Sequence, residues 1–311
     1  MSQAYHLSQG KRLCTPSLGD MTTMTTVFFQ QMLNGVILGC IYALIALGLS
    51  LIFGILEMAN FAHGEFYMLG AFIALFSMTF LGVPFLVAFL IAMAGMAVFS
   101  VTVERLVFRP IVGKPLINSM LLSFGLSTAL ANLGLYFFKA DPRKIVSGLA
   151  GIRFRFWGLF LTGERLAILV LSVVLVLGLA WFIQYTNTGK AMRAVAQDRV
   201  AAQLAGINVR RVYTITFAIS GALAAAAGTM VGAMFFVSPE MGFTVVLKSF
   251  VIVILGGFGK VRGVIFAAIL IGLVESLGGG FVSYAYKDAY PFILLVLLFI
   301  FKPEGLMGGN R

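Results

Sequence analysis

Two ionisable residues stand close together in the stretch Glu57 to Glu65, which lies between two strongly apolar segments. His63 and Glu65 are two residues apart, and an imidazole beside a carboxylate can bind a metal or transfer a proton. Polar groups at membrane depth cost roughly 2.5–3.5 kcal/mol each. The stretch is therefore either a loop at a membrane surface or a helix interruption that faces a solute pathway. In the second case the pathway residues are Asn60, His63, Gly64 and Glu65.

A second polar stretch, from Gly189 to Gly206, is rich in alanine and carries several charges. Its small residues are spaced for one short helix, its charges exclude that helix from a membrane core, and Gly206 is placed to cap it. Small side chains suit docking in a groove on another protein, but a helix resting on the bilayer surface is equally consistent. If it docks, the candidate contact residues are Arg193, Asp198, Ala201, Ala202 and Gly206.

Lys248 and Glu275 are single charges within two late apolar segments. A buried lysine and glutamate that meet form an ion pair, whereas separate ones line a pathway or extend to the membrane surface. We favour the ion pair because either charge alone would be costly to bury.

Several kinds of chemistry are excluded or disfavoured. No Gly-x4-Gly-Lys-Ser/Thr sequence is present, and the nearest run, Gly256 to Lys260, is followed by Val261 instead of a hydroxyl residue. We therefore expect no ATP hydrolysis and no enzymatic activity. The chain has only 2 histidines and 2 cysteines, so we expect no metal, no cofactor and no disulfide framework.

The composition identifies a membrane protein. The 311 residues are 60% hydrophobic and only 11% charged, and the mean hydropathy is +1.03. Soluble domains are about 25% charged, so water could not solvate this surface, but lipid can. The net charge of +11 comes mostly from loops, which indicates contact with anionic lipid rather than nucleic acid.

About nine apolar segments could form membrane spans, because a span needs about 20 apolar residues. We expect them near residues 21–56, 66–81, 85–103, 116–138, 166–185, 212–237, 245–258, 264–281 and 289–301, with the second and third separated at Gly82-Val83-Pro84. Glycines four residues apart, as at Gly35 and Gly39, predict tight helix packing. The predicted fold is an all-α polytopic bundle of about eight to nine spans with a short helix outside the membrane.

Basic residues alone do not fix the orientation. By span parity the loop 104–115 and the stretch 188–211 share a side, and both are basic. The loop 139–165 must lie on the opposite side, yet it is basic too.

Several runs together resemble the branched-chain amino acid ABC transporter permeases of the high-affinity leucine/isoleucine/valine type. The resemblance runs from about Phe28 to Gly308. It is carried by Asn34 to Gly54, by Asn60-Phe61-Ala62-His63-Gly64-Glu65, by Gly189-Lys190-Ala191-Met192-Arg193-Ala194 with Asp198 and Ala201 to Ile207, by Lys248, Leu255 to Gly259, Gly263 and Glu275, and by Lys302-Pro303-Glu304-Gly305-Leu306. Lys260-Val261-Arg262 is more basic than the family pattern at that turn.

The resemblance implies a permease subunit of an importer in the bacterial inner membrane. The partners it implies are a second related permease, two ABC ATPase subunits and a periplasmic solute-binding protein. It also places 189–206 in the cytoplasm as a coupling segment for the ATPase, with 139–165 and the N-terminus outside. We expect residues 27–308 to form the permease domain and residues 1–26 a polar segment that need not be translated, since Met21 and Met24 are alternative starts.

Two other functions stay open. An ABC permease for urea or short amides would share every feature above. An ion-coupled amino acid carrier would use Glu65 or Glu275 for protons.

Overall fold

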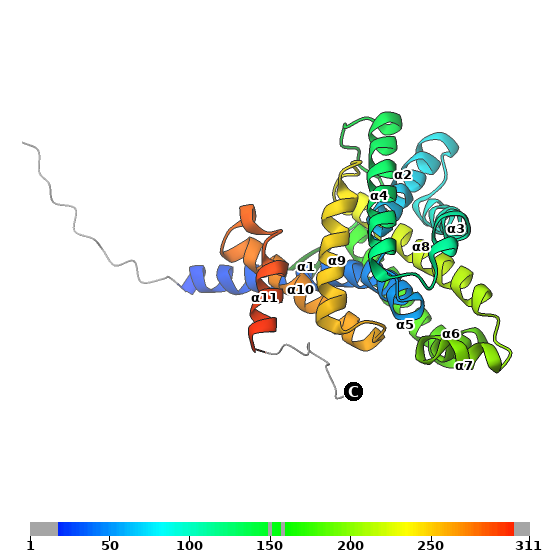
Figure 1. Ribbon diagram of the computed structural model, residues 1–311. Helices are drawn as coiled ribbons and strands as arrows, with labels where there is room; N and C mark the ends of the chain where they lie inside the picture. The colour runs from blue at the N-terminus through cyan, green and yellow to red at the C-terminus, as the bar shows by residue number, and fades with distance from the viewer. Residues whose placement is uncertain (1–17, 149–150, 157–158, 302–311) are drawn as a thin grey trace, which may run out of the picture.

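The structure, a computed structural model, describes residues 18–148, 151–156 and 159–301 (Figure 1). Most of residues 1–26 and the end of the chain after Phe301 lie outside this description. The first helix, α1 (Leu18–Leu56), begins three residues before the apolar run 21–56 in which we expected the first span.

Helices make up almost all of the described chain. Seven of them are long and apolar enough to cross a membrane: α1, α2 (His63–Leu81), α3 (Phe85–Val103), α4 (Leu116–Phe138), α5 (Gly163–Tyr185), α8 (Val209–Met234) and α10 (Val261–Phe281). Two shorter apolar helices are α9 (Met241–Gly256) and α11 (Tyr290–Phe301), and two short helices, α6 (Asn187–Gln197) and α7 (Arg199–Leu204), separate α5 from α8. The chain is thus an all-α polytopic membrane protein, as the composition predicted.

The loop expected after residue 103 is mostly helical. A π-helical turn (Glu104–Phe108) and a 3-10 turn (Arg109–Ile111) continue α3. Glu104 can be buried there because Arg109 holds its carboxylate with two hydrogen bonds, of 3.0 and 2.8 Å. A charge paired in this way no longer prevents a helix from continuing into the bundle.

A β-hairpin, which the sequence pattern did not predict, lies between α4 and α5. Strand β1 (Arg153–Phe156) pairs antiparallel with β2 (Leu159–Thr162). The side chain of Gln30 on α1 bonds to both the carbonyl and the amide of Phe160, at 3.1 and 2.9 Å. These bonds attach the hairpin to the start of the first long helix.

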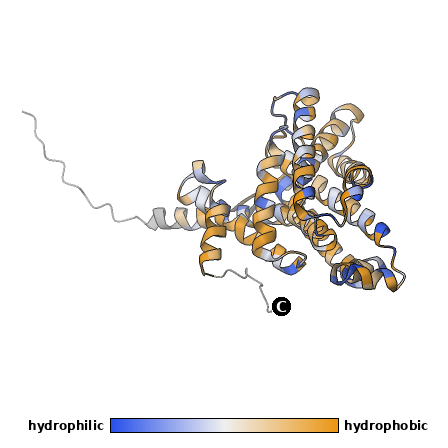
Figure 2. Ribbon diagram, viewed as in Figure 1, coloured by the Kyte–Doolittle hydropathy of each residue, from blue (hydrophilic) through white to orange (hydrophobic). Residues whose placement is uncertain are grey.

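α1 and α8 lie at the centre of the bundle, and α4 and α5 lie at its edge. In the most apolar 18-residue stretch of each helix, 78% of α1 and 72% of α8 is buried. The corresponding share is 17% in α4 and 17% in α5. The outward faces remain apolar (Figure 2). Side chains on such faces need no polar partner in lipid, so we assign the edge helices to contact with the bilayer.

Backbones approach closely where α1 packs against α10. A Cβ atom on Gly39 would lie 2.7 Å from Ile269 Cα, and one on Gly35 would lie 2.8 Å from Leu273 Cα. Rising numbers on α1 meet falling numbers on α10, so the two helices are antiparallel. Glycine is required because any side chain would separate them.

The bundle has two ends. The α6–α7 end carries α6, α7 and the last turn of α1 at Leu56. The hairpin end carries the β-hairpin, the start of α5 and the end of α8, where Val237 forms a β-bridge with Arg143.

Candidate functional site

The polar stretch after α1 lies deep in the bundle rather than at its surface. The chain turns at Glu57, which has a φ of 55°, and re-enters the bundle. His63 then lies 3.0 Å, through Nε2, from the carbonyl oxygen of Ile45. Ile45 is eleven residues before the end of α1, which is about 16 Å along the helix axis.

Two further contacts give the same depth. Ser220, eleven residues into α8, lies 3.5 Å through Oγ from His63 Nδ1. Ser127, eleven residues into α4, donates to Glu65 Oε1 at 3.2 Å. Each residue lies about 16 Å from the α6–α7 end along its helix, and a hydrocarbon core is about 30 Å thick. The non-helical backbone before α2 therefore ends near mid-depth, where irregular backbone is tolerated only inside protein or beside a cavity.

Several polar atoms in this stretch have no hydrogen-bond partner among the described residues. They are Asn60 Oδ1, Asn60 Nδ2 and Glu65 Oε2, and Asn60, His63 and Glu65 are all buried. An unpaired buried polar group costs about 1–3 kcal/mol. Gly64 lets the stretch pack tightly, because a Cβ atom there would collide with the carbonyl of Gly242 at the start of α9. The four residues expected beside a pathway are thus gathered at one occluded point.

The segment from Gly189 to Gly206 forms two helices where we expected one. Asp198 separates them, because its backbone leaves the helical region and its Oδ1 accepts hydrogen bonds from the amides of Val200 (2.8 Å) and Ala201 (2.9 Å). Asp198 thus caps the N-terminus of α7. Gly206 follows that helix with a φ of 83°, a backbone conformation common just after a helix ends.

Among the residues expected to dock, Ala202 is the one that does not lie on an exposed surface. Ala202 is only 4% exposed and packs within the bundle, whereas Val200 and Leu204 are 67% and 85% exposed, and Ala201 is exposed beside them. Arg193 is directed back to α5, where its guanidinium donates to the carbonyls of Ile183 and Gln184. Any protein that covers this end meets Val200, Ala201 and Leu204 rather than Ala202.

Basic side chains surround that face. A hollow of about 590 Å³ is lined by Arg109, Arg199 and Arg210 among others. A neighbouring hollow of about 480 Å³ is lined by Glu57, Lys114 and Arg199. The α6–α7 end therefore offers an apolar face beside a largely cationic surface.

Lys248 and Glu275 meet inside the bundle. Lys248 Nζ lies 2.9 Å from Glu275 Oε1 and 2.7 Å from Asp288 Oδ1. Tyr42 donates its hydroxyl proton to Glu275 Oε2 at 2.9 Å and accepts from Lys248 at 3.2 Å. Sequence reasoning missed Tyr42 and Asp288, although an acidic residue just before a short apolar helix was an available signal.

Asp288 lies in the loop before α11. Burial alone would raise its pKa, but the hydrogen bond from Lys248 and the charges of Lys248 and Lys287 outweigh burial and lower the pKa below its ordinary value. Asp288 therefore stays ionised and remains a partner for Lys248.

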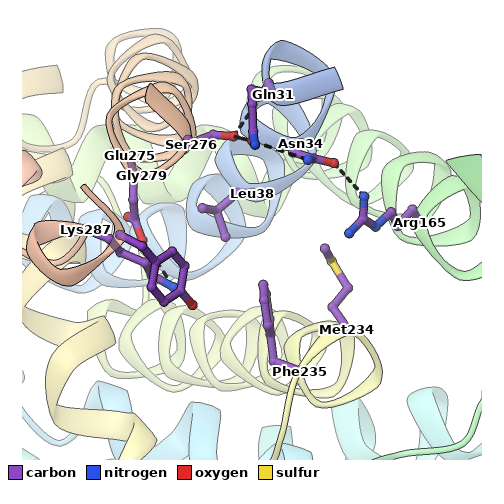
Figure 3. A pocket seen from close by; sticks show the side chains of 12 residues that line it. Gln31, Asn34, Leu38, Arg165, Met234, Phe235, Glu275, Ser276, Gly279 and Lys287 are labelled. Carbon is purple, nitrogen blue, oxygen red and sulfur yellow. Dashed lines mark hydrogen bonds and ion pairs between the residues drawn. The ribbon is translucent and has the colours of Figure 1, made fainter. Parts of the chain in front are cut away.

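A cavity of about 200 Å³ lies at the hairpin end, close to this cluster (Figure 3). Its walls come from α1, α10, the start of α5 and the end of α8, and from Tyr284 and Lys287 between α10 and α11. This cavity could not be predicted from the sequence, because its residues are far apart in the chain. Within the described residues, no group of three or more His, Cys, Asp or Glu side chains could hold a metal ion.

The chain matches the family described as branched-chain amino acid transport system, permease component, over residues 31–301. It belongs to that permease family. The permease is 33% identical over 295 residues to the high-affinity branched-chain amino acid transport system permease protein BraD of Pseudomonas aeruginosa, covering 90% of this chain and 96% of that protein.

Related permeases occur in other organisms. The permease protein LivH of Escherichia coli is 32% identical over 305 residues, covering 93% of this chain and 98% of LivH. The permease protein LivM of the same organism is 30% identical, covering 87% of this chain and 68% of LivM. The matched region contains all seven candidate spans, apart from the start of α1, and both polar stretches.

Proposed function

We propose that this permease is the membrane-spanning subunit of an ABC importer that carries branched-chain amino acids into a bacterial cell. The observation that carries the proposal is the match to BraD and LivH along the whole bundle. Both relatives are named for high-affinity branched-chain amino acid transport. Those names favour this cargo over urea or short amides.

The same relatives support the partners. LivH and LivM are two related permeases of one organism, which supports pairing of this chain with a second, related permease. A chain without a phosphate-binding loop needs separate ATPase subunits to drive it. A solute-binding protein at the hairpin end would deliver the amino acid, and that end would face the periplasm.

The proposed span count is eight, with α11 entering as a partial ninth. α8 ends at the hairpin end and α10 begins beside Gly54, near the opposite end of α1. α9 connects these points, so it supports a crossing although it has only 16 residues. α11 has 12 described residues, about 18 Å of helix, which is short of a full crossing.

The proposed mechanism is alternating access. ATP-driven closure of the ATPase subunits moves α6 and α7, and α8 transmits the movement because it follows α7 after a short turn and passes through the bundle centre. The partly unpaired stretch Asn60 to Glu65 lies where the centre must open. A transient pathway there would give Asn60 and Glu65 the polar partners that the occluded bundle lacks.

Uptake of radiolabelled leucine tests this function in cells that express the complete transporter and lack other leucine carriers. We expect uptake to stop when the ATPase subunits are inactivated in their phosphate-binding loops, and to persist when a protonophore collapses the proton gradient at maintained ATP. The opposite pattern would identify an ion-coupled carrier.

A further inference from the structure

The cavity at the hairpin end has a cation on one wall that no described carboxylate neutralises. Arg165, near the start of α5, is half-buried, and its guanidinium donates to Asn34 Oδ1 at 2.6 Å. None of the ion pairs among the described residues includes Arg165. A guanidinium has five N–H donors, so several stay available for an anion.

The acidic residue of the same cavity is already engaged. Glu275 accepts hydrogen bonds from Lys248 and Tyr42, and Lys287 lies 3.8 Å away. Its negative charge is balanced by the lysines and does not compensate Arg165. The cavity therefore has an unbalanced positive charge at the α5 side.

One part of the cavity wall, opposite the polar residues of α1 and α10, is apolar. Leu38 from α1, Met234 from the end of α8 and the adjoining Phe235 point towards the open space that Arg165 borders (Figure 3). The cavity volume of about 200 Å³ equals roughly seven water molecules at about 30 Å³ each. A solute with one carboxylate and a short aliphatic chain fits both the size and the division between charged and apolar walls.

We propose that this cavity is the site at which the permease receives its solute, with Arg165 binding the α-carboxylate and Leu38, Met234 and Phe235 contacting the aliphatic side chain. Asn34 is a positioning residue, because its bond to Arg165 fixes the guanidinium at the cavity edge. This proposal rests on the proposed function. It gives the permease a first binding site for the amino acid, separate from the stretch Asn60 to Glu65 at mid-depth.

Equilibrium binding of tritiated leucine tests the site in the complete membrane complex, purified in nanodiscs without the solute-binding protein. Leucinamide, which lacks the carboxylate, is the second probe and is measured by competition. We expect Arg165→Gln to weaken leucine binding about tenfold to a hundredfold, the range for hydrogen bonds to a charged group. Leucinamide affinity should change little, and Arg165→Lys should retain part of the preference for leucine.

Arg153→Gln is the matched control, because Arg153 is an exposed arginine on β1. It should leave both affinities unchanged. Unchanged leucine binding in Arg165→Gln would overturn the proposal, as would equal losses for leucine and leucinamide or no saturable binding in the unmodified complex. ATP-dependent leucine uptake by the unmodified complex is measured in parallel with the binding protein present. If that uptake is absent, the proposed function itself is contradicted.

Discussion

Lys248 Nζ and Glu275 Oε1 lie 2.9 Å apart, and both side chains are almost completely buried between α9 and α10. The contact joins two neighbouring helices, and Asp288 extends it to the loop before α11. Lys248 therefore contacts two carboxylates, whereas Glu275 has hydrogen bonds from Lys248 and the Tyr42 hydroxyl, with Lys287 farther away at 3.8 Å. The two partners should respond differently to substitution.

Lys248→Met should destabilise the permease more than Glu275→Gln. Without the lysine, a buried carboxylate loses its hydrogen-bonded cation, and such a loss costs about 3–5 kcal/mol. Without the Glu275 charge, Lys248 keeps Asp288 at 2.7 Å. Thermal unfolding of the purified variants in detergent measures the order, and Asp288→Asn should be mildest because that side chain is 66% exposed. The reverse order would show that Lys248 is not the centre of the cluster.

The packing of α1 against α10 predicts that Gly39→Ala lowers the melting temperature. The new Cβ atom would lie 2.7 Å from Ile269 Cα, so the backbones must separate, and overpacking of this kind costs about 1–3 kcal/mol. Gly125→Ala on α4 is the control, because nothing lies within 4 Å of a Cβ atom there. It should be neutral or slightly stabilising, since alanine favours helix by up to about 1 kcal/mol over glycine. Equal changes in melting temperature for Gly39→Ala and Gly125→Ala would refute the close approach of α1 and α10.

His63→Leu should impair leucine uptake without loss of the protein from the membrane. The substitution removes the contact with the Ile45 carbonyl at mid-depth and leaves the neighbouring helices intact. His63→Gln retains a donor and should preserve more uptake. Uptake and membrane abundance are measured together, and normal uptake by His63→Leu would make the stretch a structural feature only.

The exposed face of α7 predicts which substitutions separate docking from folding. Leu204→Glu and Ala201→Glu should reduce co-purification of the ATPase subunits at normal permease abundance, because both positions are exposed. Ala202→Glu should instead lower the abundance, because Ala202 is 4% exposed and a carboxylate there would be buried without a partner. Val146→Glu, at an exposed position near the hairpin end, is the control. If the ATPase subunits co-purify fully with both Leu204→Glu and Ala201→Glu, α7 does not dock on them and is a helix at the membrane surface.

The sequence predicted the helices well and the polar contacts less well. Continuous apolar runs indicate spans directly, so α4 was placed at the residues where the structure has it. The hairpin was missed because its strands are short and depend on Gln30, more than a hundred residues earlier in the chain. The break at Asp198 was missed because residues that favour helix lie on both sides of it. The break is marked instead by the Asp198 side chain, which accepts hydrogen bonds from the first amides of α7.

The candidate sites show the same limit. The types and spacing of Asn60, His63 and Glu65 identified an unusual stretch, but its depth depends on contacts with α4 and α8. Arg165 was one of several basic residues in a loop region and had no distinguishing neighbour in the sequence. Its position beside Leu38 and Met234 follows only from how α1, α5 and α8 pack.

Reconstitution in proteoliposomes tests the central claim most directly. Leucine accumulation is measured with the ATPase subunits, the second permease and the binding protein present, with and without this chain, and with and without Mg-ATP. We predict accumulation only when this chain and Mg-ATP are both present, and no ATP hydrolysis by the purified chain alone. ATP hydrolysis by the isolated chain, or leucine accumulation by it without ATP, would contradict the account.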